Sequence, residues 1–138
     1  MSLKVVKFGG SSLADANQFR KVAYIIKSDA DRRFVVPSAP GKRFSDDIKI
    51  TDMLYKCFDL ASNSLDFDKE FDTIKERYNG IIADLGVDIS LEDDFNTIKN
   101  ELKSKPNRDF AASRGEFLNG KILAAFLGFE FIDAAEII

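Results

Sequence analysis

The stretch Leu3–Ser12, with the sequence LKVVKFGGSS, decides the fold class of this chain. Its first half is a short apolar run rich in β-branched residues, which is typical of a buried strand. Gly9 and Gly10 end that run, and the cap-type residues Ser11–Asp15 precede apolar residues at helical spacing. A second apolar run, Arg33–Pro37, predicts another buried strand. The first forty residues are therefore expected to form a right-handed βαβ unit with parallel strands.

The rest of the chain predicts a polar loop, several helices and one more strand. After the loop we expect a helix from Thr51, a helix over 67–85 ended by Gly86, a helix opened by a capping box at Ser90 and Asp93, a helix from about Ser113 to Gly128, and a strand over Phe129–Ile132. Parallel sheets normally have both faces covered and more than three strands. We therefore expect an α/β fold, a three-layer αβα doubly wound and mainly parallel sheet, of which residues 1–138 are the N-terminal portion.

Composition excludes several classes of protein. The chain has 138 residues, no histidine, one cysteine and a net charge of −3. The absence of histidine excludes Ser/His/Asp triads and His-ligated metals, and the single cysteine excludes an internal disulfide. No apolar run approaches the roughly 18 residues of a membrane helix, and the basic residues are dispersed without interleaved aromatics. We expect a cytoplasmic protein with neither a membrane nor a nucleic acid as partner.

The loop Lys7–Ser12 is the first candidate for chemistry. Adjacent glycines let backbone N–H groups approach a ligand closely, and a following helix start would add partial positive charge, so the loop suits a phosphate. Lys7 could reach phosphate oxygens with its flexible ammonium. The pattern alone leaves open a plain tight turn with a surface lysine.

Two further candidates lie at a strand end and near a predicted helix start. Ser38, directly after the second strand, and Thr51 could hydrogen-bond a small polar substrate at the carboxyl edge of the sheet. The Glu116 carboxylate either lies in the first turn of its helix, where the helix dipole stabilises a negative charge, or binds an ammonium group in a cleft. Spacing alone leaves both interpretations of Glu116 open.

Four motifs in order, VVKFGGSS, VVPSAPG, TD at 51–52 and SRGEFL, resemble the N-terminal half of an aspartokinase, an enzyme of the amino-acid kinase superfamily. They span Val5–Leu118 and so cover most of the chain. The resemblance implies the amino-acid kinase fold and transfer of the ATP γ-phosphoryl group to the side-chain carboxylate of L-aspartate. The product, 4-phospho-L-aspartate, opens lysine, threonine and methionine biosynthesis.

The resemblance also assigns residues to roles. It implies catalysis by Lys7, and phosphate or ATP binding by Lys7, Gly9, Gly10, Ser11 and Ser12. It implies aspartate binding by Ser38, Thr51, Arg114 and Glu116, with Glu116 holding the α-ammonium group. This sequence departs from the family pattern where KRFSDDIKI separates Gly41 from Thr51, and where Asn119 replaces the usual serine.

The resemblance further implies ATP and Mg²⁺ as cofactors and a homo-oligomer at full length. No metal ligand is predicted in this chain, and the family's nucleotide-binding part and ACT regulatory domains would lie beyond residue 138. We therefore expect this part alone to be inactive. Two alternatives remain: another amino-acid kinase with a different acceptor, and a non-catalytic truncated fragment or anion-binding module.

Overall fold

The computed structural model describes residues 3–136, and it begins with the expected βαβ unit. Strand β1 (Lys4–Phe8) pairs in parallel with β2 (Arg32–Pro37), with Val6 opposite Val35. A short 3₁₀ turn, η1 (Gly10–Leu13), and helix α1 (Ala16–Lys27) connect the two strands. The prediction of two parallel strands joined by a helix is confirmed.

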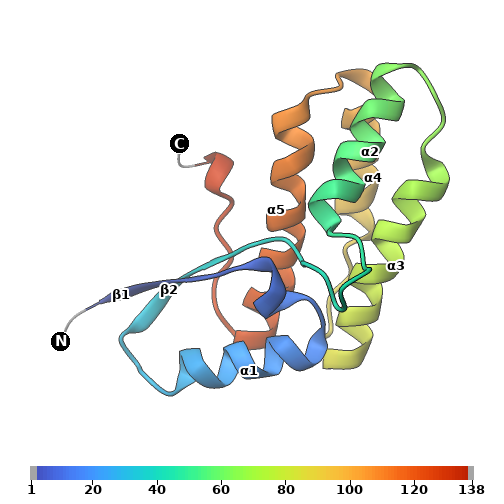
Figure 1. Ribbon diagram of the computed structural model, residues 1–138. Coiled ribbons are helices and arrows are strands. Elements are labelled where there is room, and N and C mark those ends of the chain that lie inside the picture. Colours follow the sequence, from blue (N-terminus) through green and yellow to red (C-terminus); the bar gives the residue numbers. More distant parts are fainter. Residues whose placement is uncertain (1–2, 137–138) are drawn as a thin grey trace.

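Four long helices form the larger part of the described residues. They are α2 (Ile50–Ser62), α3 (Asp68–Leu85), α4 (Glu92–Ser104) and α5 (Arg108–Leu127), and a 3₁₀ turn, η2 (Ala134–Glu136), follows them. Figure 1 shows these helices side by side, with the two strands and α1 lying across one end of the group. Gly86 and Gly128 end α3 and α5 in the left-handed conformation, which a residue without a Cβ adopts at little cost.

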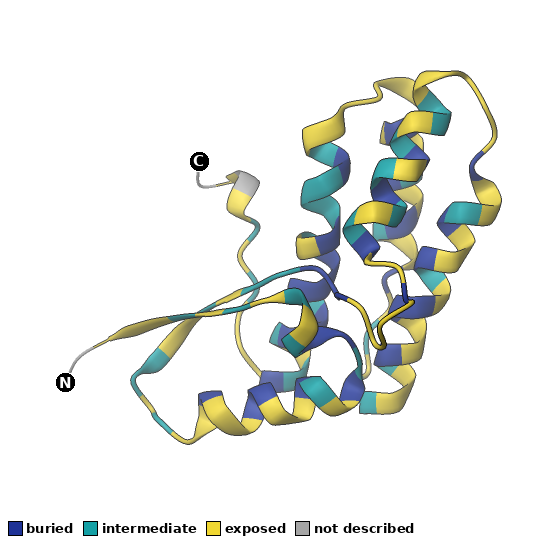
Figure 2. Ribbon diagram, in the orientation of Figure 1, coloured by how far each residue is buried: buried dark blue, intermediate teal, exposed yellow. Residues whose placement is uncertain are grey.

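The core lies between the helices and continues under the strands (Figure 2). The predicted apolar stripe of α4 is buried, and Phe95 in that stripe packs edge-on against Phe71 of α3 with ring centroids 6.3 Å apart. From α1, Phe19 and Ile26 enter the same core. Helical periodicity in the sequence thus identified the buried faces correctly.

The sheet is covered on one face only within the described residues. Val6, Phe8 and Val35 pack against the core, whereas Val5 and Phe34, which lie opposite each other on the other face, are 69% and 52% exposed. Lys7 and Val36 share that exposed face, because side chains alternate along a strand.

Three expectations about local structure are wrong. Residues 129–132 form no strand: their backbone joins neither β1 nor β2, and Phe131 instead packs edge-on against Phe117 of α5, with centroids 5.5 Å apart. Helix α5 begins at Arg108 and not near Ser113, because the side chain of Asn107 caps it by accepting from the Phe110 amide at 2.9 Å.

The third concerns the capping box before α4. The Ser90 hydroxyl accepts from the amide of Glu92 at 3.3 Å, and the residue at the cap position is Leu91, which has no side-chain cap. The predicted helix exists, but the reciprocal Ser90–Asp93 arrangement does not form.

Candidate active site

The glycine loop turns directly out of β1. Gly9 is extended and opens η1, where the Ser12 amide donates to the Gly9 carbonyl at 3.1 Å. Helix α1 starts at Ala16, directly after the cap-type residues, and the Asp15 carboxylate caps it by accepting from the Gln18 amide at 2.9 Å. The dipole of α1 therefore acts some residues beyond the glycines, and its end is already occupied by a carboxylate.

The glycine loop and the loop after β2 touch backbone to backbone. The Gly41 amide donates to the Gly10 carbonyl at 2.9 Å, and the Ser38 amide donates to the Phe8 carbonyl at 3.0 Å. A Cβ on Gly41 would lie 2.6 Å from the Gly10 carbonyl carbon, and one on Gly10 would lie 2.9 Å from the Ala39 carbonyl oxygen. Both positions require glycine because a methyl group would separate the loops.

Helix α5 brings Glu116 to the same place. Gly115 lies so close to the loop that a Cβ there would be 2.7 Å from the Cβ of Ala39. The buried Tyr78 hydroxyl of α3 donates to the Gly115 carbonyl at 2.8 Å, and burial raises the pKa of that phenol well above its usual value. Since α5 begins at Arg108, Glu116 sits in the middle of the helix. The first-turn interpretation of Glu116 is therefore wrong, and its carboxylate is free of that capping role.

A cavity of about 510 Å³ forms where these loops, the start of α2 and the middle of α5 meet. Small-molecule sites typically enclose roughly 300 to 1,000 Å³. Five of the candidate residues line it: Gly10, Ser11, Ser38, Thr51 and Glu116. Residues from three separate parts of the sequence thus converge on one ligand-sized space. A smaller cavity of about 310 Å³, between α4 and α5, contains none of the candidates.

The other four candidates do not line the cavity. The side chain of Lys7 is exposed and forms no hydrogen bond or ion pair with another described residue, while Gly9 is exposed and Ser12 half-buried. The guanidinium of Arg114 lies over two aromatic rings of its own helix, 5.0 Å from the centroid of Phe110 and 4.5 Å from that of Phe117. The roles of these four residues stay predictions.

Two lysines of the polar loop also line the cavity. Lys42 and Lys49, at the two ends of the long polar loop, line the cavity together with Glu116. The insertion that separates Gly41 from Thr51 therefore does not remove Thr51 from the site. Thr51 stays at the cavity because the backbone amide of the preceding residue, Ile50, donates to the Pro40 carbonyl at 3.2 Å. This hydrogen bond joins the start of α2 to the loop after β2.

Two buried polar residues support the cavity from behind. Asn119 of α5 is fully buried and donates from Nδ2 to the Ser38 carbonyl at 2.8 Å, which keeps Ser38 in place. Arg77 of α3 is 7% exposed, and burial lowers the pKa of its guanidinium. Sequence reasoning missed Arg77, although an arginine directly beside the apolar stripe of α3 was a signal that a charged group enters the core.

Within residues 3–136 there is no group of three or more acidic or cysteine side chains arranged to hold a metal ion. Among the same residues, the helices lack the combination of length and apolar character that spanning a membrane requires.

Comparison with known proteins relates this arrangement to one family. The model of the amino acid kinase family matches residues 2–138. Aspartokinase 3 of Bacillus subtilis is 39% identical over 140 residues, an alignment that covers 96% of this chain and 30% of that protein. Bifunctional aspartokinase/homoserine dehydrogenase 1 of Arabidopsis thaliana is 28% identical over 141 residues, covering 90% of this chain and 15% of that protein.

Solved structures give the same result. The aspartate kinase of Clostridium acetobutylicum superposes with a TM-score of 0.96 at 50% identity, covering 100% of this chain and 32% of that one. E. coli aspartokinase III, solved with aspartate and ADP, shares the fold with a TM-score of 0.68 at 20% identity, covering 92% of this chain and 29% of that one. The chain thus spans about a third or less of the length of these relatives. The similarities confirm the resemblance that the motifs indicated. They also confirm the predicted α/β fold, and this chain corresponds to the N-terminal portion of that fold.

Proposed function

The chain belongs to the amino acid kinase family, and from this premise we propose that it is the acceptor-binding part of an ATP-dependent aspartokinase. The full-length protein transfers the γ-phosphoryl group of ATP to the side-chain carboxylate of L-aspartate, giving 4-phospho-L-aspartate and ADP. The similarity to the Clostridium acetobutylicum enzyme over the whole chain supports aspartate as the acceptor.

One observation carries the proposal: the charges around the cavity complement those of an acidic amino acid. Glu116 supplies a carboxylate, and Lys42 and Lys49 supply two ammonium groups. Aspartate presents one ammonium and two carboxylates, so it can pair with both kinds of side chain. The hydroxyls of Ser38 and Thr51 add neutral hydrogen-bonding groups at the same cavity.

The chemistry requires positioning and positive charge more than a side-chain nucleophile, because the acceptor carboxylate itself attacks phosphorus. In the proposed site Glu116 binds the α-ammonium group and thereby aims the side-chain carboxylate toward the glycine loop. The amides of Gly9 and Gly10 and the ammonium of Lys7 stabilise the negative charge of the transferred phosphoryl group, and Ser11 and Ser12 complete the loop that binds it. A single residue separates Lys7 from Gly9, and the lysine carries its ammonium on a flexible four-carbon stem.

The described residues do not fit a resident magnesium site. Mg²⁺ prefers carboxylate and water oxygens, and the cavity offers the single carboxylate of Glu116 beside two lysines. No step is therefore assigned to a metal on this part of the sequence.

A coupled ADP-release assay on the full-length protein tests the proposed function. The acceptor panel contains L-aspartate, L-glutamate, a nucleoside monophosphate and carbamate. We expect turnover with aspartate, and turnover with another member of the panel in its place would assign a different amino acid kinase activity. Failure to turn over any of the four acceptors would contradict the proposal.

Lys7→Ala tests the electrostatic role of the lysine. Removing a group that stabilises developing charge typically costs about 10² to 10³ in kcat, and the KM for aspartate should stay nearly unchanged. Lys21→Ala, at an exposed lysine of α1 away from the cavity, is the matched control. Unaltered kcat in Lys7→Ala would remove Lys7 from the site.

Glu116→Ala tests the binding role of the carboxylate. A lost charge-assisted hydrogen bond corresponds to roughly a 10- to 100-fold rise in the KM for aspartate, with a smaller change in kcat. Glu76→Ala, which removes an exposed carboxylate from α3, should leave that KM unchanged. An unaffected KM in Glu116→Ala would exclude Glu116 from substrate binding.

The same proposal extends to the setting of the enzyme. An aspartokinase would begin lysine, threonine and methionine biosynthesis, act in the cytoplasm and assemble as a homo-oligomer at full length. A reducing compartment is supported by Cys57, which is a free buried thiol. Sedimentation of the full-length protein measures the oligomeric state directly.

A further inference from the structure

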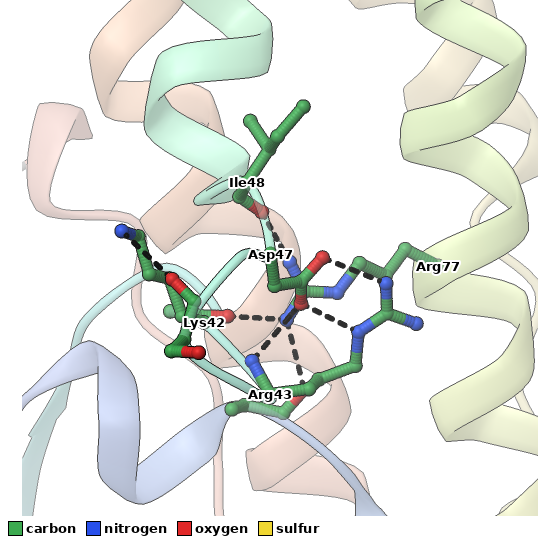
Figure 3. Close-up of polar contacts among 8 residues, drawn as sticks. Lys42, Arg43, Asp47, Ile48 and Arg77 are labelled. Atoms are coloured by element: carbon green, nitrogen blue, oxygen red, sulfur yellow. Dashed lines mark hydrogen bonds and ion pairs between the residues drawn. The ribbon is translucent and has the colours of Figure 1, made fainter.

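The long polar loop that brings two lysines to the cavity is tied at both ends to one buried side chain. Arg77 reaches from α3 and donates through Nη1 to the Ile48 carbonyl at 3.0 Å, and through Nη2 to the Gly41 carbonyl (Figure 3). Nη2 also donates at 3.0 Å to the carbonyl of Ala14, the residue directly after η1. One guanidinium therefore joins the glycine loop to the start and the end of the polar loop.

The carboxylate of Asp47 holds the same polar loop together through hydrogen bonds within the loop. It is 6% exposed and accepts from the backbone amide of Arg43 at 2.9 Å and from Nε and Nη2 of the Arg43 side chain at 2.7 and 2.9 Å. The Nη2 atom of Arg77 lies 3.9 Å from the same carboxylate (Figure 3). The segment 41–48 is thus a closed ring held by two guanidinium groups and one carboxylate.

The geometry of this ring determines where two lysines stand. Lys42 directly follows the held carbonyl of Gly41, and Lys49 directly follows the held carbonyl of Ile48. Both residues line the cavity. The ammonium of Lys42 lies 3.5 Å from the Ser45 carbonyl, whereas the ammonium of Lys49 has no hydrogen-bond or ion-pair partner among the described residues and is available to a ligand.

Packing alone does not account for Arg77. A buried guanidinium is costly to desolvate, and its Nε is buried without a hydrogen-bond partner. An apolar side chain of similar volume would pack α3 against the loops at lower cost, but it could not hold three carbonyls at a defined separation. An arginine is suited to this position because its planar guanidinium carries several donors at fixed separations.

We propose that Arg77 is a positioning residue which, through the ring 41–48, holds Lys49 in the cavity as the binding group for an anionic part of the substrates. That anion is either a carboxylate of the acceptor or the phosphoryl group that is transferred. The inference rests on the proposed function, and it adds two residues that the sequence motifs do not contain.

Steady-state kinetics of the full-length protein test it with Lys49→Gln, Arg77→Gln and the double variant. Losing a charge-assisted contact raises KM about tenfold, and kcat should change by only a few-fold. A rise in the KM for aspartate identifies the carboxylate as the anion, and a rise in the KM for ATP identifies the phosphoryl group. Because Arg77 acts through Lys49, the double variant should be no worse than the more impaired single variant.

Ile98→Val is the control for a purely structural effect. Ile98 is buried in α4, so its truncation lowers the unfolding temperature and leaves both KM values unchanged. Three results would overturn the proposal: unchanged KM values in Lys49→Gln, effects that multiply in the double variant, or an Arg77→Gln enzyme that loses only stability, as Ile98→Val does.

Two further arms keep the test decisive. If Arg77→Gln does not fold, Asp47→Asn replaces it, and it should raise the same KM as Lys49→Gln because it opens the ring. If the wild-type protein phosphorylates an acceptor other than aspartate, the proposed function fails and the same comparison proceeds with that acceptor. If the wild-type protein phosphorylates none of the acceptors, amide hydrogen exchange of residues 41–49 tests the role of Arg77. Arg77→Gln or Asp47→Asn must then accelerate this exchange, and Ile98→Val must leave it unchanged. Unchanged exchange refutes the proposed role of Arg77.

Discussion

Replacing Gly41 by alanine should damage both the stability and the activity of this protein. The new Cβ would lie 2.6 Å from the Gly10 carbonyl carbon, 2.8 Å from the Ser11 nitrogen and 2.9 Å from the Gly10 oxygen. All three atoms belong to backbone, so no side chain can move aside. Ordinary contact begins near 3.4 Å, and the two loops must therefore separate by about 0.8 Å.

The magnitude follows from two contributions. Forcing a methyl group into a closed contact costs about 1 to 3 kcal/mol. The separation also stretches the hydrogen bond from the Gly41 amide to the Gly10 carbonyl, now 2.9 Å, whose net worth is about 1 kcal/mol. Together they lower the free energy of unfolding by about 3 kcal/mol. A shift of nearly 1 Å between groups that bind two reactants costs about 10²-fold in kcat/KM.

Urea unfolding followed by circular dichroism measures the stability, and the ADP-release assay on the full-length protein measures kcat/KM. Gly80→Ala is the matched control, because Gly80 lies in α3 with open space where a Cβ would stand. Alanine there should raise the stability by up to about 1 kcal/mol through helix propensity alone. The same chemical change is thus expected to act with opposite sign at the two positions.

Wild-type stability in Gly41→Ala would show that the two loops are not in backbone contact. A stable variant with undiminished kcat/KM would also refute the placement of the cavity between them. Lower stability with kcat/KM unchanged would confirm the contact between the two loops and refute the position of the substrate site between them.

The remaining predictions concern two buried ionisable groups. Hydrogen bonds from Arg43 hold the pKa of the Asp47 carboxyl well below its usual range, so its contribution to stability is present above about pH 4, the pKa of an unfolded aspartate, and is lost as the pH falls below it. Asp47→Asn should therefore cost roughly 2 kcal/mol in urea unfolding at pH 7 and progressively less toward pH 3, and a gap independent of pH would contradict the charge-based explanation. Burial raises the pKa of the Cys57 thiol to about 12, so the thiol of the native protein should not react with thiol reagents at pH 8. In a urea titration its labelling should appear with the same midpoint as unfolding. Rapid labelling of the Cys57 peptide in the folded protein would show that the core around α2 opens.

Much of the secondary structure could be predicted from periodicity. The β-branched run before the glycines and the apolar residues of α1 repeat at the spacing of a strand and a helix, and the structure contains both. The stripe of α3 and its end at Gly86 are equally local features. Predictions failed where a competing contact decided the outcome: Phe131 packs on Phe117 and joins no strand, and Asn107 starts α5 earlier than its apolar residues suggest.

By itself the sequence determined which local elements form and that two glycines stand at the end of a strand, because both follow from the conformational preferences of neighbouring residues. Only the tertiary structure decided that Gly10 touches Gly41, that Glu116 reaches their cavity from the middle of α5, and that Arg77 draws the distant polar loop against both. These contacts join residues 29 to 106 positions apart, and no local pattern records them. The hydrogen bonds among them form because buried backbone carbonyls must find donors once the helices close over them.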